Sequence, residues 1–109
     1  MSIPAAQVAH LPTRSRRRDG SQAPFDTDRI LSAIRRAGEA SGEFAEDEAR
    51  LLTSQVVKVL SHGHFPGGIP DIERVQDIVE QTLIAANHLG TARAYISYRD
   101  QHRRLRADR

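Results

Sequence analysis

The strongest constraint on the fold is a turn signal followed at once by a helix start near the N-terminal end. Asp19-Gly20 separates two short stretches, and an Asp-Gly pair is the strongest short-range indication of a β-hairpin, because both residues tolerate positive φ. Phe25 and Asp26 then precede an amphipathic stretch, with Asp26 as the N-cap and Phe25 placed for a hydrophobic staple. The segment predicts a hairpin over about residues 13–25 that leads directly into a helix.

Three arginines, Arg16, Arg17 and Arg18, run straight into this turn. Guanidinium forks match phosphate oxygens two at a time, and the free N–H groups of a helix start add positive charge. A hairpin with this cluster, facing a helix start, predicts a cradle for phosphates. Strand alternation places Arg16 and Arg18 on one side and Arg17 on the other, so we expect Arg16 to be the least secure ligand.

Apolar residues at helical spacing, interrupted by Gly and Pro, predict four helices after the hairpin. The first runs from Asp26 to Gly42, the second over about 45–61, the third from Asp71 as N-cap to about 87, and the fourth from Thr91 as N-cap. The expected core faces include Ile30, Leu31, Ile34, Ala37, Leu52, Val56, Val59, Leu60, Ile72, Val75, Ile78, Val79, Leu83, Ala92, Tyr95 and Ile96.

A two-stranded hairpin is marginal alone and must pack on something. The predicted class is therefore α+β and mostly helical, a four-helix bundle capped by an N-terminal β-hairpin or small β-sheet. The 109 residues suffice for one domain with a modest core, and an aromatic content of only 5% makes that core aliphatic.

Composition excludes several kinds of chemistry. The chain has no cysteine, which removes disulfides, thiolate metal sites and thiol nucleophiles. The pair His62-x-His64 is too weak for a metal site, and Gly67-Gly68 lacks the Gly-Lys-Ser/Thr of a P-loop. No apolar run reaches the ~20 residues of a membrane span, and no secretory signal is evident. We expect cytoplasmic residence, no metal site and no membrane partner.

The net charge of +2 hides an uneven distribution. Lys58 is the one lysine, and arginines gather near both ends, while acids crowd the stretch 43–48. Basic ends indicate anionic partners, but the balanced total argues against a dedicated DNA-binding protein.

Three segments together resemble the ATP-cone domain. The opening, basic-basic-Asp-Gly-Ser followed by Pro-Phe-Asp-x-x-Arg-Ile, is similar to the start of that family, and residues 71–83 are similar to its third helix. Residues 92–99 resemble its last helix, especially in the cones that begin anaerobic ribonucleoside-triphosphate reductases. The resemblance covers residues 14–104. It leaves 1–13 as an expected flexible leader and 105–109 as a charged tail.

This resemblance implies an allosteric module of a ribonucleotide reductase, or a stand-alone relative, that binds ATP or dATP, with Mg²⁺. In that family ATP permits activity and dATP shuts it down, often through a change of oligomeric state. The implied partners are adenine nucleotides, a reductase catalytic domain or subunit, and a second copy of the chain in a nucleotide-dependent oligomer. The chain itself is then not an enzyme.

The resemblance also implies site residues. Arg17 and Arg18 take the two basic positions that contact the triphosphate, Asp26 takes a position whose side chain contacts the nucleotide, and Arg29 takes a further basic position. Gln76 and Gln101 fall where some members direct polar or basic groups toward the ligand. Local sequence alone is equally consistent with a helix cap and solvated arginines.

Two alternatives remain open at this point. A small arginine-rich chain can bind nucleic acid, although few exposed aromatics and an acidic middle make this less favoured. A degenerate cone that serves only for docking is also open. Arg17 stands where many members have lysine, and Ala23 stands where some have a polar contact.

Overall fold

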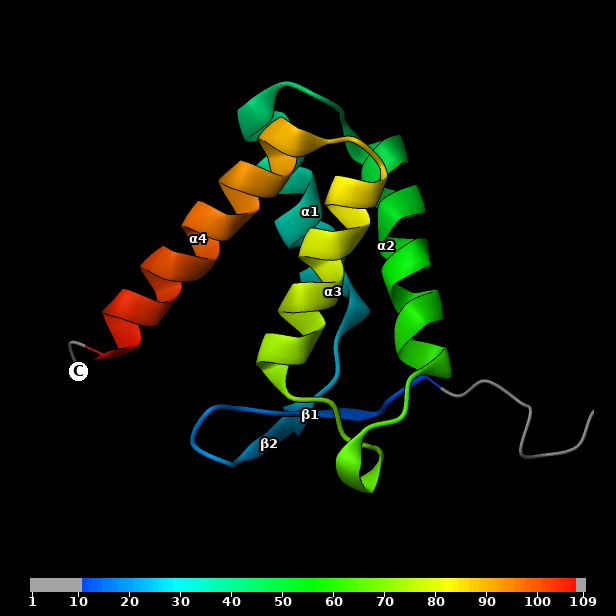
Figure 1. Cartoon of the computed structure of the whole chain (residues 1–109), viewed down its shortest axis with the longest axis vertical. Coiled ribbons are helices and arrows are strands. Elements are labelled where there is room, and N and C mark those ends of the chain that lie inside the picture. Colours follow the sequence, from blue (N-terminus) through cyan, green and yellow to red (C-terminus); the bar gives the residue numbers. More distant parts are fainter. Residues whose placement is uncertain (1–10, 108–109) are drawn as a thin grey trace, which may run out of the picture.

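The computed structural model describes residues 11–107. It consists of a small antiparallel sheet followed by four helices (Figure 1). The elements are β1 (Arg14–Arg16), β2 (Gln22–Pro24), α1 (Thr27–Ser41), α2 (Glu46–His62), a short 3-10 turn η2 (Pro66–Gly68), α3 (Ile72–Ala85) and α4 (Leu89–Ala107). The predicted class, a helical bundle capped by an N-terminal hairpin, is confirmed. The expected leader lies mainly outside the described residues.

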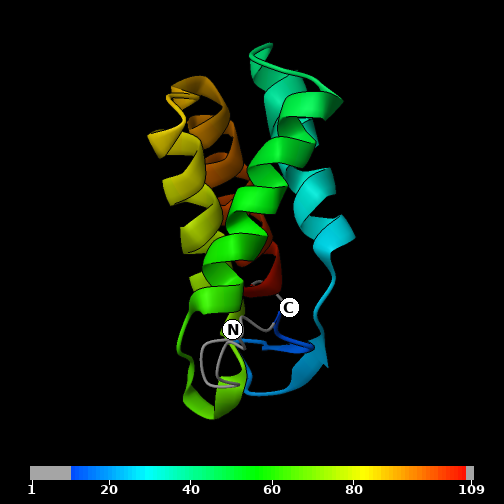
Figure 2. The ribbon, with the colours of Figure 1, turned by 90° about the vertical axis from the view of Figure 1, so that its right-hand side faces the viewer.

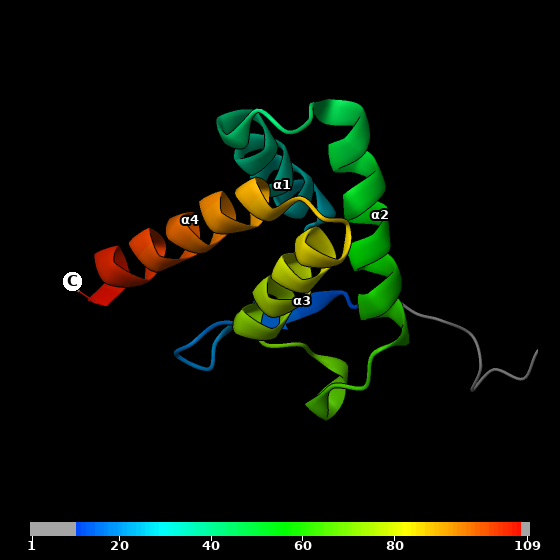
Figure 3. The same cartoon turned by 45° about the horizontal axis from the view of Figure 1, so that its top comes forward.

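The helices form a ring in which each packs on two neighbours. α1 packs against α2 and α4, and α3 packs against the same two helices. Figure 2 shows that the hairpin lies across one end of the bundle, where α1 and α3 begin. In Figure 3, α4 diverges from α3 toward its C-terminal end, so the bundle opens on the side of the hairpin.

The hairpin turn differs from the expected two-residue link. Arg17 N–H donates to Ser21 O (2.8 Å) and Gly20 N–H donates to Arg17 O (3.0 Å). Gly20 has φ +87°, whereas Asp19 is not among the residues with positive φ. This is the pattern of a three-residue loop with a left-handed glycine. The Asp19 carboxylate instead accepts hydrogen bonds from the backbone and hydroxyl of Ser21, which lower its pKa.

The hairpin is joined to the start of α3. Arg16 N–H donates to Pro70 O (2.9 Å), and Arg16 forms an isolated parallel bridge with Asp71. This backbone link places the arginines of the hairpin turn beside the N-terminus of α3.

Two of the four predicted helix caps are confirmed in detail. The Asp26 carboxylate accepts from the Asp28 N–H, and Gly42 ends α1 with φ +74°. Asp71 occupies the N-cap position of α3, but its side chain makes no capping hydrogen bond. The prediction for Thr91 was wrong, because α4 begins at Leu89 and Thr91 lies within its first turn.

Glu43, in the loop between α1 and α2, supplies the missing cap of α4. Its Oε1 accepts from the Thr91 N–H (2.5 Å) and the Thr91 hydroxyl (2.6 Å). These hydrogen bonds lower the pKa of Glu43 below its ordinary value. A carboxylate at a helix N-terminus is also favoured by the helix dipole. This long-range contact joins the loop that follows α1 to the first turn of α4.

The core is aliphatic, as expected. The largest fully buried side chains include Ile34, Leu52, Val56, Leu60, Val79 and Leu83. Two predicted core residues are wrong: Val59 is 49% exposed and Ile96 is 37% exposed. α2 packs mainly against α1 and α3, so only part of its apolar face is buried, and Val59 lies outside that part. Within residues 11–107, no helix is long and apolar enough to cross a bilayer.

Neighbouring leucines of α2 provide a direct test of this core. Leu52 is completely buried, whereas Leu51 is 52% exposed. Leu52→Ala is expected to lower the free energy of unfolding by about 2–5 kcal/mol, because it removes buried methyl groups and leaves a cavity. Leu51→Ala is the matched control and should change stability by less than about 1 kcal/mol. Chemical denaturation of both variants measures the difference, and equal losses would contradict this core.

The Glu43 cap predicts a pH-dependent contribution to stability. Because folding lowers the pKa of Glu43 from 4.5, its contribution is complete above the unfolded value and is lost as the pH falls through the folded value. Glu43→Gln should lower the melting temperature by a few degrees at pH 7. The gap from the unmodified chain should close below pH 4.5, which thermal unfolding monitored by circular dichroism measures. A gap that persists undiminished at pH 3 would contradict the capping role.

Candidate functional site

A cleft of about 510 Å³ lies between α1, α3 and α4 on the side where α4 diverges. We call it the helix cleft. Its inner wall is apolar and includes Ile30, Ala33, Val75, Val79 and Tyr95. Its remaining lining is mostly polar and basic: Arg18, Arg29, Ser32, Arg36, Gln76, Tyr98, Arg99, His102 and Arg103, together with Ile72. An apolar wall beside convergent polar groups is the usual form of a small-molecule site.

A second, more open cleft of about 720 Å³ adjoins the first. We call it the hairpin cleft, since it lies between the β-turn, the start of α3 and the end of α4. It is lined by Arg16, Arg17, Arg18, Gly20, Asp71, Ile72, Glu73 and Arg103. Arg18, Ile72 and Arg103 line both clefts. The two hollows therefore adjoin at these residues, and we call them together the recess, with four arginines at its hairpin end.

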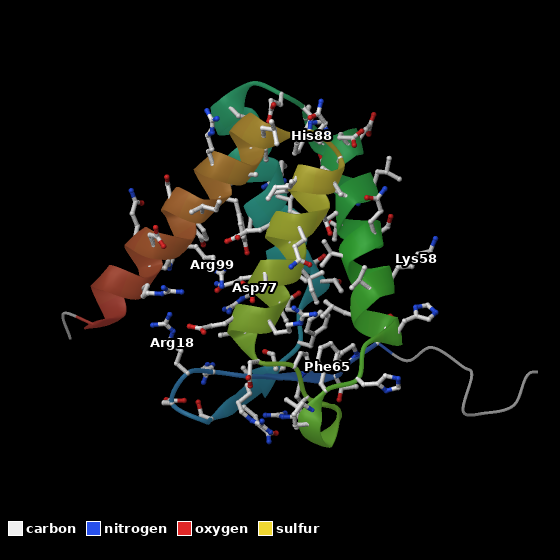
Figure 4. The ribbon with its side chains drawn as sticks, viewed as in Figure 1. Arg18, Lys58, Phe65, Asp77, His88 and Arg99 are labelled. Carbon is white, nitrogen blue, oxygen red and sulfur yellow. The ribbon has the colours of Figure 1, made fainter. Side chains whose placement is uncertain are left out.

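Arg99 joins α4 to α3 along the wall of the helix cleft. Its side chain is only 10% exposed. Its guanidinium donates to Gln76 Oε1 (2.9 Å), to Glu80 Oε1 (2.5 Å) and to the backbone oxygen of Glu73 (3.2 Å), and lies 2.9 Å from Asp77. Figure 4 shows Arg99 and Asp77 between the two helices.

The charge state of Arg99 is secured by these partners. Burial acts to lower the pKa of Arg99, but the hydrogen bonds to Glu80 and Asp77 outweigh it and raise the pKa overall. The nearby Tyr95 side chain is buried, and desolvation raises the pKa of its hydroxyl. Arg99 is therefore a permanent cation, and Tyr95 a neutral phenol, at neutral pH.

The arginines of the hairpin cleft are held by acids at the start of α3. Arg18 reaches from the hairpin toward α3 (Figure 4), and its Nη2 is 2.5 Å from Glu73 Oε1. The same oxygen lies 3.8 Å from Arg103 Nη2, and Arg16 Nη1 lies 3.8 Å from Asp71 Oδ1. Arg17 makes no ion pair with any residue that the structure describes.

The structure brings four of the six residues expected at the site into this recess. Arg18, Arg29 and Gln76 line the helix cleft, and Arg17 and Arg18 line the hairpin cleft. The amide oxygen of Gln76 accepts a hydrogen bond from Arg99, so this oxygen is not free to accept one from a ligand.

The other two expected residues line neither cleft. The Asp26 carboxylate caps α1, and Gln101 is exposed on α4. The expected separation of Arg16 from Arg17 is also not observed, because both line the hairpin cleft. β1 ends at Arg16, so strand alternation does not extend through the turn.

Sequence reasoning missed several lining residues. Arg36 follows Arg29 by seven residues on α1, a spacing that places both on one helix face. Arg99 and Arg103 are one turn apart on α4, and Tyr98 and His102 repeat this spacing. The Tyr98 and His102 rings lie 4.3 Å apart between centroids. Helical spacing could have found these pairs, but not the cleft that they share.

Comparison with known proteins assigns the family. The model of the ATP cone domain matches residues 15–104. The chain is 33% identical over 101 residues to the ribonucleoside-diphosphate reductase subunit alpha of Chlamydia muridarum, which covers 85% of this chain and 10% of the relative. It is 37% identical over 83 residues to the anaerobic ribonucleoside-triphosphate reductase of Haemophilus influenzae, which covers 76% of this chain and 12% of the relative.

A third relative extends the range of reductases. The vitamin B12-dependent ribonucleoside-diphosphate reductase of Mycobacterium tuberculosis is 36% identical over 95 residues, 87% of this chain and 13% of that protein. The chain therefore belongs to the ATP-cone domain family, as its three sequence motifs indicated. It spans about a tenth of the length of these relatives. The part shared with these relatives coincides with the stretch that the ATP cone domain model covers, residues 15–104.

Metal binding by the protein alone has no support in residues 11–107. No group of three or more His, Cys, Asp or Glu side chains is arranged there to hold a metal ion. His62, singled out in the sequence, lies at the end of α2 and its Nδ1 is 2.8 Å from the Lys58 backbone oxygen. The His62 side chain therefore contacts a backbone carbonyl in the last turn of α2.

The Arg99 network predicts a large effect of substitution on stability. Arg99→Ala leaves the Asp77 and Glu80 carboxylates side by side without their shared cation. The loss should be about 1–3 kcal/mol in the free energy of unfolding, since hydrogen bonds to charged groups are among the stronger ones. Arg99→Lys keeps the charge but not the planar fork of the guanidinium. Its free energy of unfolding should therefore lie between those of Arg99→Ala and the unmodified chain. Urea denaturation orders the three proteins; equal stability of Arg99→Ala and the unmodified chain would contradict this role.

Proposed function

We propose that the chain is an allosteric module that binds ATP and dATP in the recess formed by the helix cleft and the hairpin cleft. The observation that carries the proposal is the division of this recess into an apolar wall and an arginine-rich end. A purine base needs a flat apolar surface, and a triphosphate needs several guanidinium groups at its other end. The two adjoining clefts of the recess offer both.

The size and charge of the recess fit a nucleotide. The helix cleft, at about 510 Å³, falls within the ~300–1,000 Å³ of typical small-molecule sites. Adenine would lie against the wall of Val75, Val79 and Ala33, and the phosphates would extend toward Arg18 and Arg103. Two helices, α1 and α3, begin at this end of the bundle (Figure 1), and helix N-termini favour negative charge.

Among the individual residues, we propose that Arg17 and Arg18 bind the phosphates and that Arg29 contributes a further cation at the rim. Gln76 would act indirectly by orienting Arg99, to which it is hydrogen-bonded. Asp26 and Gln101 reach the nucleotide only if the hairpin or α4 moves on binding. Mg²⁺ would enter with the nucleotide, held mainly by its phosphates, as is usual for this ion.

A sensor of the balance between ATP and dATP has to bind both. A site that depends on a hydrogen bond to the ribose 2′-hydroxyl rejects the deoxy form by up to ~10⁴-fold, so affinity should come from the base and phosphates that both ligands share. Discrimination would then lie in the coupling to a partner, typically about 1–3 kcal/mol. We propose a cytoplasmic ribonucleotide reductase as that partner, with control of its activity or oligomeric state through residues 14–104.

The first test measures adenine-nucleotide binding by the isolated chain. ATP and dATP should both raise its melting temperature, whereas adenosine should have little effect. Arg18→Ala should weaken binding of both nucleotides by about tenfold or more in isothermal titration calorimetry, since hydrogen bonds to charged groups are worth about 1.5–3 kcal/mol each.

Arg50→Ala is the matched control. Arg50 is an exposed arginine of α2 that pairs with Glu46 and lines neither cleft, so this variant should bind nucleotide like the unmodified chain. Absence of any thermal shift with ATP or dATP would reject nucleotide binding and favour a docking domain. Binding to DNA or RNA with a steep salt dependence would instead favour the nucleic-acid alternative.

A further inference from the structure

Glu73 is placed where a phosphate oxygen would be expected. It lies in the first turn of α3, and one of its carboxylate oxygens lies 2.5 Å from Arg18 Nη2 and 3.8 Å from Arg103 Nη2. A single anionic oxygen between two guanidinium groups, one from the hairpin and one from α4, is the arrangement in which arginines hold a phosphate.

We propose that Glu73 is an internal competitor of the nucleotide phosphates. Its carboxylate engages Arg18 and Arg103 while the cleft holds no polyphosphate, and it must give up these arginines when one enters. The proposal rests on the proposed function, since it concerns the same recess. Glu73 then sets how tightly the recess binds the phosphates of the nucleotide.

The charge balance of the hairpin cleft supports this role. Four arginines line it, against only two acids, Asp71 and Glu73. Asp71 is 3.8 Å from Arg16, at the edge of an ion pair, whereas Glu73 is in direct contact with Arg18. Arg17 has no ionic partner among residues 11–107 and is available to an incoming phosphate at once. Arg18 becomes available only after Glu73 has moved, whereas Arg103, at 3.8 Å from the same carboxylate oxygen, is held more loosely.

Exposure decides how strong this competition is. The side chains of Arg18 and Glu73 are 42% and 46% exposed, and an ion pair with this much solvent contact is weak. Glu73 therefore reduces affinity without closing the cleft. Its negative charge also repels the bound phosphates, and at separations of a few ångströms this costs roughly a fivefold factor in affinity near a hydrated surface.

The same contacts link nucleotide binding to the arrangement of the elements. Glu73 belongs to α3, Arg18 to the hairpin turn and Arg103 to α4. When phosphates replace the carboxylate, the ligand takes over the connection between hairpin and α4, and α3 loses its part in it. The Arg99 contacts would still join α4 to α3.

The test compares Glu73→Gln with Glu39→Gln in isothermal titration calorimetry. Glu39 is exposed on α1 and lines neither cleft, so both variants gain the same net charge. The titrants are ATP, ADP, adenosine and sodium tripolyphosphate. Glu73→Gln should bind ATP and tripolyphosphate about fivefold more tightly than the unmodified chain, ADP with a smaller gain and adenosine with none. Glu39→Gln should show no gain.

The outcomes separate this inference from the proposed function. If the unmodified chain binds ATP but Glu73→Gln binds it equally or more weakly, Glu73 is no competitor and the inference fails alone. If neither protein binds an adenine nucleotide, the proposed function fails. The inference then stands only if Glu73→Gln binds tripolyphosphate more tightly than the unmodified chain. An equal gain in Glu39→Gln would reduce the effect to net charge and overturn it, and thermal melts confirm that each variant is folded.

Discussion

The contact between Arg99 and the acidic stripe of α3 is the interaction on which the recess depends. α4 leans away from α3 toward the hairpin (Figure 3), and apolar packing along the seam gives way to a cleft. Arg99 spans this seam with hydrogen bonds to Gln76, Glu80 and the Glu73 backbone. A buried cation without such partners would be very costly. The network therefore joins α4 to α3 along the wall of the helix cleft.

The charged side chains at this end of the molecule form two groups. The inner group, around Arg99, is mostly buried, and its arginine is hydrogen-bonded to α3. The outer group, around Arg17 and Arg18, is exposed, weakly paired and able to exchange partners. Exposed pairs of this kind contribute little to stability. They are suited to respond to a ligand, whereas the inner group around Arg99 stabilises the packing of α4 on α3.

Membership of the ATP-cone family gives these features their context. The relatives are reductases about ten times longer than the matched segment, so under the proposed function the cone would act on chemistry that takes place elsewhere. A regulatory domain of this size needs a ligand site whose occupancy changes a surface. The recess lies between the hairpin and the C-terminal half of α4, where residues 101–103 are exposed.

Local signals in the sequence determined the elements. The Asp26 cap, the terminating Gly42 and the apolar spacing of the helices predicted the order of the elements, because each depends on residues within one or two turns. Periodicity also identified Leu52 and Leu83 as core. The arginine run before the turn indicated an anion site for the same reason: a dense charge cluster is visible without knowledge of the fold.

Only the tertiary structure decided which partners these residues meet. Glu43 rather than Thr91 caps α4, since the loop after α1 happens to reach it. Asp71 lies near Arg16 instead of capping its own helix, and Val59 remains at the rim because α2 packs mainly against α1 and α3. Arg36 on α1 joins the recess together with Arg99 and Arg103 on α4, which follow it by more than sixty residues in the sequence. Sequence spacing fixes the face of a helix, but the approach of another helix decides what that face encloses.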